Sequence, residues 1–137
     1  NQRLIYKRFN QMYNRYRAKN IFKRISDDNL KWLIKGLTEK QNNGTIKIKY
    51  PKDWELQIYQ AGMISDKKIW KYIEKLNRDV LIFFAEFTRA PNKKVISRLV
   101  KKSNYLSSEL IEKHTHLFPF ERPKLIAEKI INWQKNA

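Results

Sequence analysis

The sequence predicts a mainly α-helical protein, a compact domain built from several helices. Only 3 glycines and 4 prolines occur among 137 residues, so strong chain breaks are few. Apolar side chains recur every three or four residues over much of the chain, which is the spacing of one helix face. The hydrophobic content of 42% and the aromatic content of 13% exceed those of a disordered basic tail and allow a buried core.

The first 25 residues are predicted to form a basic, aromatic-rich amphipathic segment. Between residues 4 and 18, Ile5, Phe9, Met12 and Tyr16 recur at helical spacing with arginines between them. We expect residues 26–137 to form one helical domain, with a three-helix core over 27–78 and further helices over 93–137.

The second helix is expected to begin at a cap, Ser26 or Asp27, and to end near Gly44. Serine and aspartate accept hydrogen bonds from the free amides of a first turn, and glycine favours the left-handed backbone beyond a helix end. Residues 45–50 alternate polar and apolar side chains, which is typical of a short strand or an extended link. Pro51 suits the first turn of a helix that runs to about Gln60.

The chain after this helix divides into a turn and further apolar segments. We predict a turn at residues 61–64, where Gly62 can adopt a positive φ, and then a helix over 66–78. Residues 80–88 are apolar throughout and fit a helix or a strand equally well. Helices are predicted over residues 93–102, 107–117 and 121–136, and Glu109 and Glu112 are expected to be exposed on the second of them.

The order of residues in the core resembles a homeodomain. The features that carry the resemblance are Tyr50-Pro51 before a helix, Gly62-Met63 in the turn, and the later Ile69, Tyr72 and Ile73. The resemblance implies a helix-turn-helix whose last helix lies in the major groove of DNA. Lys75 stands near the place of the family's base-reading asparagine, so readout of adenine in the family's style is not expected. Lysines dominate the outer face of residues 66–78 and suit phosphates better than paired contacts to guanine, so we expect binding with little preference for sequence.

A winged helix is the alternative layout. Residues 45–50 would be its first strand, and residues 80–88 and 95–100 would form a small β-hairpin with residues 89–94 as a basic wing. The all-helical layout is favoured because residues 95–102 carry apolar side chains at three- and four-residue spacing. Both layouts imply the same DNA partner.

The net charge of +17 predicts a polyanionic partner. Residues 1–26 carry +8, residues 27–92 carry +3 and residues 93–137 carry +6, so the charge gathers at two poles. We expect double-stranded DNA, or alternatively RNA, to be the partner, together with other protein subunits, and we expect no membrane. The predicted nucleic-acid-binding side chains are Lys67, Lys68, Lys71, Lys75, Arg78, Arg3, Lys7, Arg8, Arg15, Arg17, Lys94 and Arg98.

Residues with catalytic potential are few. The chain has no cysteine and no nucleophile elbow of the Gly-x-Ser-x-Gly type. Glu112, His114 and His116 form a Glu-x-His-x-His pattern. On a helix two histidines at this spacing point apart and cannot share a metal. On a strand they could share one, but a third ligand is not evident. We expect the histidines to be half-buried polar residues near the break at Pro119, and we expect no metal and no cofactor.

The function expected from these observations is that of a non-catalytic, nuclear DNA-binding subunit. With its Lys, Asn and Ile bias the chain resembles the DNA-binding accessory subunits of ciliate adenine-N6 methyltransferase complexes. The alternatives are an RNA-binding, ribosome-associated protein and a protein-interaction scaffold.

Overall fold

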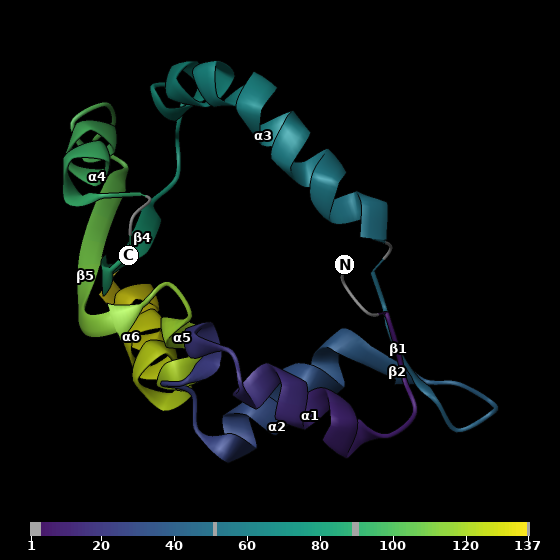
Figure 1. Cartoon of the computed structure of the whole chain (residues 1–137). Coiled ribbons are helices and arrows are strands. Elements are labelled where there is room, and N and C mark those ends of the chain that lie inside the picture. The colour runs from purple at the N-terminus through teal and green to yellow at the C-terminus, as the bar shows by residue number, and fades with distance from the viewer. Residues whose placement is uncertain (1–3, 51, 89–90, 137) are drawn as a thin grey trace. The chain divides into compact units, whose positions relative to one another are not determined.

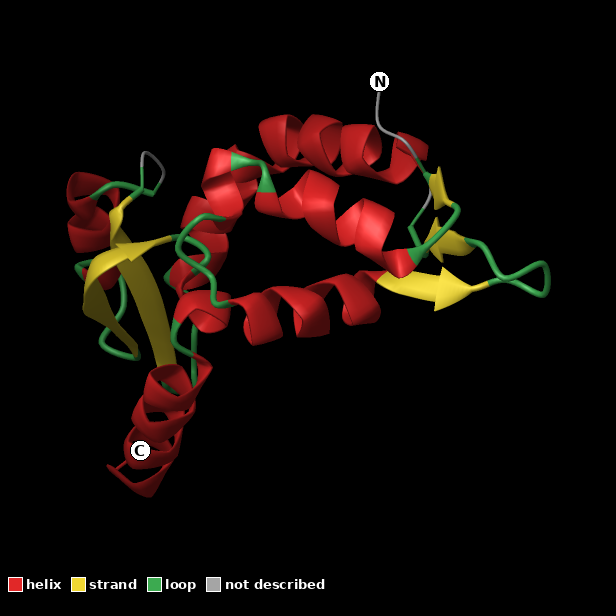
Figure 2. Ribbon diagram, turned by 60° about the horizontal axis from the view of Figure 1, so that its bottom comes forward, coloured by secondary structure: helices red, strands yellow, loops and turns green. Residues whose placement is uncertain are grey.

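The computed structural model describes residues 4–50, 52–88 and 91–136. The chain forms two compact units, Asn1–Ala61 and Gly62–Ala137. Each unit contains helices and a sheet, as the red and yellow elements of Figure 2 show. The prediction of a mainly α protein is therefore wrong. In the described part of the chain, none of the helices has the length and apolar character that a membrane crossing requires.

The first unit is built around two packed helices. Its elements are β1 (Ile5–Tyr6), α1 (Phe9–Arg17), η1 (Asn20–Phe22), α2 (Asp27–Leu37), β2 (Thr38–Lys40) and β3 (Ile46–Ile48). Helix α1 packs against α2, and the side chains of Met12, Leu30 and Ile34 are fully buried. The helical spacing of Met12 and Tyr16 thus did indicate the buried face of α1.

Local signals explain where α2 begins and ends. The Ser26 hydroxyl oxygen accepts a hydrogen bond from the Asn29 amide at 3.3 Å, which confirms the predicted cap. The helix ends at Leu37, well before Gly44, because Thr38 adopts an extended backbone and its hydroxyl donates to the Ile34 carbonyl at 2.7 Å. The chain then forms the hairpin of β2 and β3, with Gly44 at a φ of 79° in its loop.

The three short strands of the first unit form an antiparallel sheet in the order β1-β3-β2. Thr38 pairs with Ile48 across β2 and β3, and Ile5 pairs with Lys47 across β1 and β3. Ile48 and Tyr6 are buried against the helices, so this sheet closes one side of the unit's core.

Helix α3 (Lys52–Ile73) is continuous over 22 residues and spans the boundary between the two units (Figure 1). The predicted turn at residues 61–64 is absent, and with it the helix-turn-helix. Gly62 continues the helix because one glycine in a helix interior costs only about 1 kcal/mol relative to alanine. Pro51, which the prediction placed at a helix start, lies outside the described residues.

The second unit is a β-α-β arrangement followed by two helices. Strand β4 (Val80–Phe87) leads into α4 (Lys93–Val100), strand β5 (Leu106–Thr115), α5 (Phe118–Glu121) and α6 (Pro123–Asn136). β4 and β5 are parallel, with Val80 opposite Leu106 and Ala85 opposite Ile111. Helix α4 makes the crossover that a parallel pair requires, and it packs on β5 through the buried Ile96.

Two predictions for this unit are wrong. Residues 107–117, expected as a helix, lie mostly in β5, and the hairpin of the winged-helix layout is instead a strand followed by a helix. Residues 80–88, left open between helix and strand, form β4. The start of a helix at Lys93 is confirmed, and the Asn92 side chain caps it by accepting from the Val95 amide at 3.1 Å.

Ion pairs connect elements within the second unit. Lys129 of α6 pairs with Glu109 of β5, so a carboxylate that suggested an exposed helix face instead holds α6 to the strand. Lys102, after α4, pairs with Glu74, after α3, and this hydrogen-bonded cation lowers the pKa of the Glu74 carboxyl below its usual value.

Candidate active site at the ends of the parallel strands

The carboxyl ends of β4 and β5 lie at the same edge of the parallel pair (Figure 1). Ligand and active sites of open α/β sheets lie at this edge. β4 ends there with Glu86 and Phe87, and β5 ends with His114 and Thr115, followed directly by His116. The two acid-base residue types most used in catalysis, carboxylate and imidazole, therefore occur together at one place in the fold.

The end of β5 departs from regular pairing. Ala85 is opposite Ile111, but Phe87 is opposite Thr115, so β5 has extra residues between Ile111 and Thr115. Within this irregularity Lys113 has a φ of 58°, which costs a residue with a side chain roughly 1–2 kcal/mol. The Lys113 amide donates to Glu86 Oε2 at 2.6 Å, and this bond from the neighbouring strand helps to hold the unusual backbone.

Thr115 and Glu121 form a second connection beside His116. The Thr115 hydroxyl donates to Glu121 Oε1 at 2.5 Å, and the Thr115 amide lies 3.4 Å from Glu121 Oε2. The same hydroxyl oxygen accepts from the Leu117 amide at 3.1 Å. Glu121, at the end of the short helix α5, is only 7% exposed.

The two histidines differ in their surroundings. His114 is half-buried, and its Nδ1 lies 2.6 Å from the carbonyl oxygen of Glu112. His116 is exposed in the turn that follows β5, whereas the sequence had suggested a half-buried residue. Among the residues that the structure describes, no three His, Cys, Asp or Glu side chains are grouped to hold a metal.

This arrangement can supply a base but not a nucleophile of the elbow type. The imidazole of His116 is open to solvent, and two carboxylates, Glu86 and Glu121, accept hydrogen bonds from Lys113 and Thr115 shortly before it in the chain. An imidazole exchanges protons near neutral pH, which suits general acid-base catalysis. The Gly-x-Ser-x-Gly motif is absent from all 137 residues.

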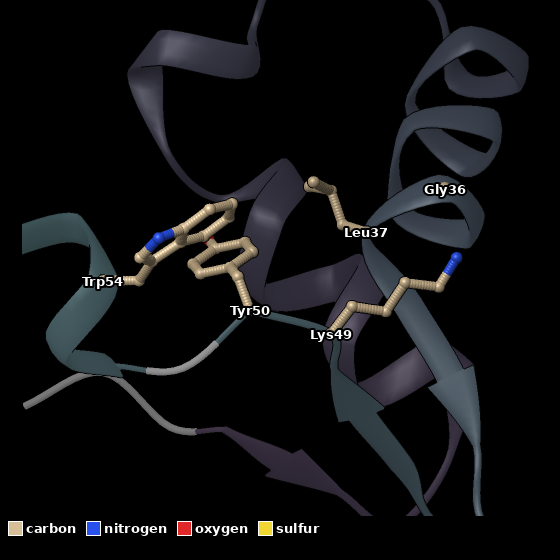
Figure 3. A pocket seen from close by; sticks show the side chains of 5 residues that line it. All are labelled: Gly36, Leu37, Lys49, Tyr50 and Trp54. Carbon is tan, nitrogen blue, oxygen red and sulfur yellow. The ribbon is translucent and has the colours of Figure 1, made fainter. Parts of the chain in front are cut away.

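The first unit contains an apolar recess of about 460 Å³ (Figure 3). It is lined by Gly36, Leu37, Lys49, Tyr50 and Trp54, from α2, the end of β3 and α3. In Figure 3 the Lys49 side chain extends toward α2 and away from Trp54. The volume lies in the usual range of small-molecule sites, but the lining residues offer neither a carboxylate nor an imidazole. The recess can take up an apolar group.

The basic side chains predicted to bind nucleic acid lie in both units and not on one recognition helix. In the first unit, Lys7, Arg8 and Arg15 are exposed, and Arg3 lies outside the described residues. In the second unit, Lys71, Lys75, Arg78 and Lys94 are exposed. Lys67 and Lys68 are within α3, but their side chains lie outside the described part.

Two of the arginines have structural contacts. Arg17 Nη1 donates to the carbonyl oxygens of Phe22 at 3.1 Å and Ile25 at 2.9 Å, and Arg17 Nη2 pairs with Asp27 at 2.7 Å. The Arg98 guanidinium lies over the Trp70 ring, 5.1 Å from its centroid. These two cations hold segments of the chain together, so counting them as binding groups overstated the free charge.

The residues at the strand ends were missed because 107–117 was interpreted as a helix. A strand at 80–88, the clear helix after Lys93 and a strand ending near His114 would have indicated a β-α-β unit. The carboxyl-end rule would then have pointed to Glu86 and His116. The available signal was the pair of apolar segments on either side of one amphipathic helix.

Comparison with solved structures shows a likeness of fold to esterases and other hydrolases. An esterase from Mycobacterium tuberculosis matches with a TM-score of 0.73 and 12% identity, over 97% of this chain and 44% of the esterase. The peroxisomal α/β-hydrolase Lpx1 from Saccharomyces cerevisiae matches with a TM-score of 0.77 and 16% identity, over 98% of this chain and 35% of the hydrolase. E-2-(acetamidomethylene)succinate hydrolase matches with a TM-score of 0.71 and 11% identity, over 97% and 47%. No family model matches the chain, and no curated protein matches it.

The chain thus has the fold of part of these enzymes and spans less than half of their length. This likeness overturns the homeodomain-like interpretation and the accessory-subunit resemblance, because the neighbours are esterases and hydrolases and not DNA-binding domains. It also overturns the expectation of a non-catalytic protein. Hydrolase-fold neighbours give no support to a DNA or RNA partner, nor to a ribosome-associated protein or a scaffold.

Proposed function

We propose that this chain is the histidine-bearing part of an ester-hydrolysing enzyme, with His116 as its general base. The observation that carries the proposal is the position of His116, directly after β5 at the carboxyl edge of the parallel pair, in a chain with a hydrolase fold. In α/β-hydrolases the triad residues follow the order Ser, Asp or Glu, His along the chain. Glu86 followed by His116 agrees with the second half of that order.

The proposed reaction is acyl transfer to a nucleophile supplied from outside these 137 residues, since no nucleophile elbow occurs within them. A ring nitrogen of His116 takes the proton of the attacking hydroxyl as its oxygen bonds to the ester carbonyl carbon. The same nitrogen then gives the proton to the departing alcohol oxygen. Water, activated in the same way, releases the acid from the acyl-enzyme.

Glu86 is the proposed acid of this arrangement. Among the described residues it is the carboxylate at the carboxyl end of β4, and it accepts a hydrogen bond from the amide of Lys113 in β5, shortly before His116 in the chain. A carboxylate there stabilises the imidazolium that forms as the base takes its proton. We therefore propose that Glu86 orients His116 and stabilises its protonated form, and that it does not attack the substrate.

The test is hydrolysis of p-nitrophenyl acetate and butyrate by the protein expressed from its complete reading frame. We expect His116→Ala to lower kcat by about 10²–10⁴-fold, the usual contribution of a general base. Glu86→Gln should also lower kcat. His114→Ala is the matched control. Its kcat should stay within about threefold of that of the unmodified protein, because Nδ1 of the His114 ring is already in contact with the Glu112 carbonyl oxygen.

A His116→Ala enzyme with unchanged kcat would refute the proposal. A loss in both histidine variants together with a lowered melting temperature would point to folding and not to catalysis, and would also count against it. Labelling with a fluorophosphonate, in which the oxygen of an activated serine displaces fluoride from phosphorus, provides a second readout. Labelling should slow for His116→Ala and remain normal for His114→Ala.

A further inference from the structure

We propose that Thr115 and Glu121 are positioning residues that set the orientation of His116. This inference rests on the proposed function, since it concerns the same base. Neither side chain is expected to touch the substrate. Their effect would be transmitted through the backbone on both sides of the histidine.

Hydrogen bonds of the Thr115 side chain surround His116 in the chain. The Thr115 hydroxyl donates to Glu121 at 2.5 Å and accepts from the Leu117 amide at 3.1 Å. The Thr115 hydroxyl thus links the amide that follows the histidine to Glu121 of α5. These bonds restrain the chain before and after His116.

The carboxylate of Glu121 is buried. Glu121 is 7% exposed, and taking a charged carboxylate out of water is costly unless hydrogen bonds compensate. Thr115 supplies two such bonds, one from its hydroxyl and one from its amide at 3.4 Å. Because Glu121 is buried, its hydrogen bond with Thr115 is shielded from competing water and stabilises the turn that follows β5.

A second carboxylate bonds to the chain on the same, amino-terminal side of His116. Glu86 holds Lys113, whose positive φ begins the change in direction, while Glu121 holds Thr115. Two carboxylates from different elements, β4 and α5, therefore converge on the few residues before the histidine. A base must meet its partner within a fraction of an ångström, and anchoring of the residues just before His116 supplies that precision.

The experiment uses three variants of the same complete protein. Thr115→Val keeps the shape of the side chain and removes the hydroxyl, Thr115→Ser keeps the hydroxyl, and Glu121→Gln keeps the shape of the acid. We expect Thr115→Val and Glu121→Gln to lower kcat for p-nitrophenyl butyrate about 10- to 100-fold with KM within about twofold. Thr115→Ser should remain within about threefold, which makes it the rescue. Ser108→Ala, which removes an exposed hydroxyl from the same strand, is the control.

A readout that does not depend on activity is the hydrogen exchange of the Leu117 amide. That amide should exchange faster in Thr115→Val, which lacks the acceptor, and at the original rate in Thr115→Ser. Unchanged kcat in Thr115→Val and Glu121→Gln, with His116→Ala inactive, would overturn the positioning inference and leave the proposed function intact. An active His116→Ala would instead refute the proposed function, and unchanged Leu117 exchange in Thr115→Val would remove the structural basis of the inference.

Discussion

At the scale of single residues, the same side-chain type serves different purposes depending on where the backbone places it. Arg15 and Arg17 are two positions apart on α1, which puts them on different sides of the helix. Arg15 is exposed, while Arg17 reaches back to the carbonyls of Phe22 and Ile25 and to Asp27. Net charge alone does not distinguish a cation of the first kind from one of the second.

Arg17→Ala should destabilise the first unit by about 1–3 kcal/mol, since charge-assisted bonds to two carbonyls are lost. Arg17→Lys should recover little of this, because one ammonium cannot reproduce the fork of a guanidinium. Urea unfolding followed by tryptophan fluorescence measures both changes. Arg15→Ala, which removes a neighbouring exposed cation, should shift the midpoint much less, and equal effects of the two alanine variants would contradict this assignment.

At the scale of elements, α3 is the clearest case in which a local signal was misinterpreted. Gly62 followed by Met63 suggested a turn, but the residues on both sides are adequate helix formers and the helix passes through. The meaning of a glycine depends on its φ. Gly44 has a φ of 79°, which side chains rarely adopt, whereas Gly62 has ordinary helical geometry.

We expect Gly62→Ala to stabilise α3 by up to about 1 kcal/mol, since an added Cβ meets nothing within 4 Å and alanine favours a helix. Gly44→Ala, in which the added Cβ also has open space, should instead destabilise the hairpin by about 1 kcal/mol because of its φ. Helicity by circular dichroism and the thermal midpoint measure the pair of variants. A loss of stability in Gly62→Ala would revive a turn at residues 61–64.

At the scale of the whole molecule, the sequence predicted those elements whose signals are local. The caps around Ser26 and the helix from Lys93 could be recognised from a few neighbouring residues. The parallel pairing of β4 with β5 could not, because a crossover of many residues separates the partners and Glu109 and Glu112 suggested an exposed helix face. The candidate site was missed for the same reason, since Glu86 and His116 come together only through that pairing.

Charge was the other source of error at this scale. A value of +17 predicts attraction to any polyanion, but it says nothing about the fold. Part of that charge is engaged inside the units, as in the pairs of Lys102 with Glu74 and Lys129 with Glu109. The likeness to hydrolases rests on backbone arrangement, which composition does not report.

The two-stranded sheet also affects how molecules of this protein associate in solution. Within the described residues β4 pairs with β5 in a two-stranded sheet. The opposite edge of β4, a largely apolar strand, can therefore pair with a strand of another molecule. At low salt the mutual repulsion of molecules that each carry +17 should keep such edges apart. Raising the salt from about 0.05 M to about 1 M shortens the screening length to about 3 Å and should allow association. Dynamic light scattering of the 137-residue chain would then report growing particles, and a constant radius across the series would mean that the edge of β4 is protected.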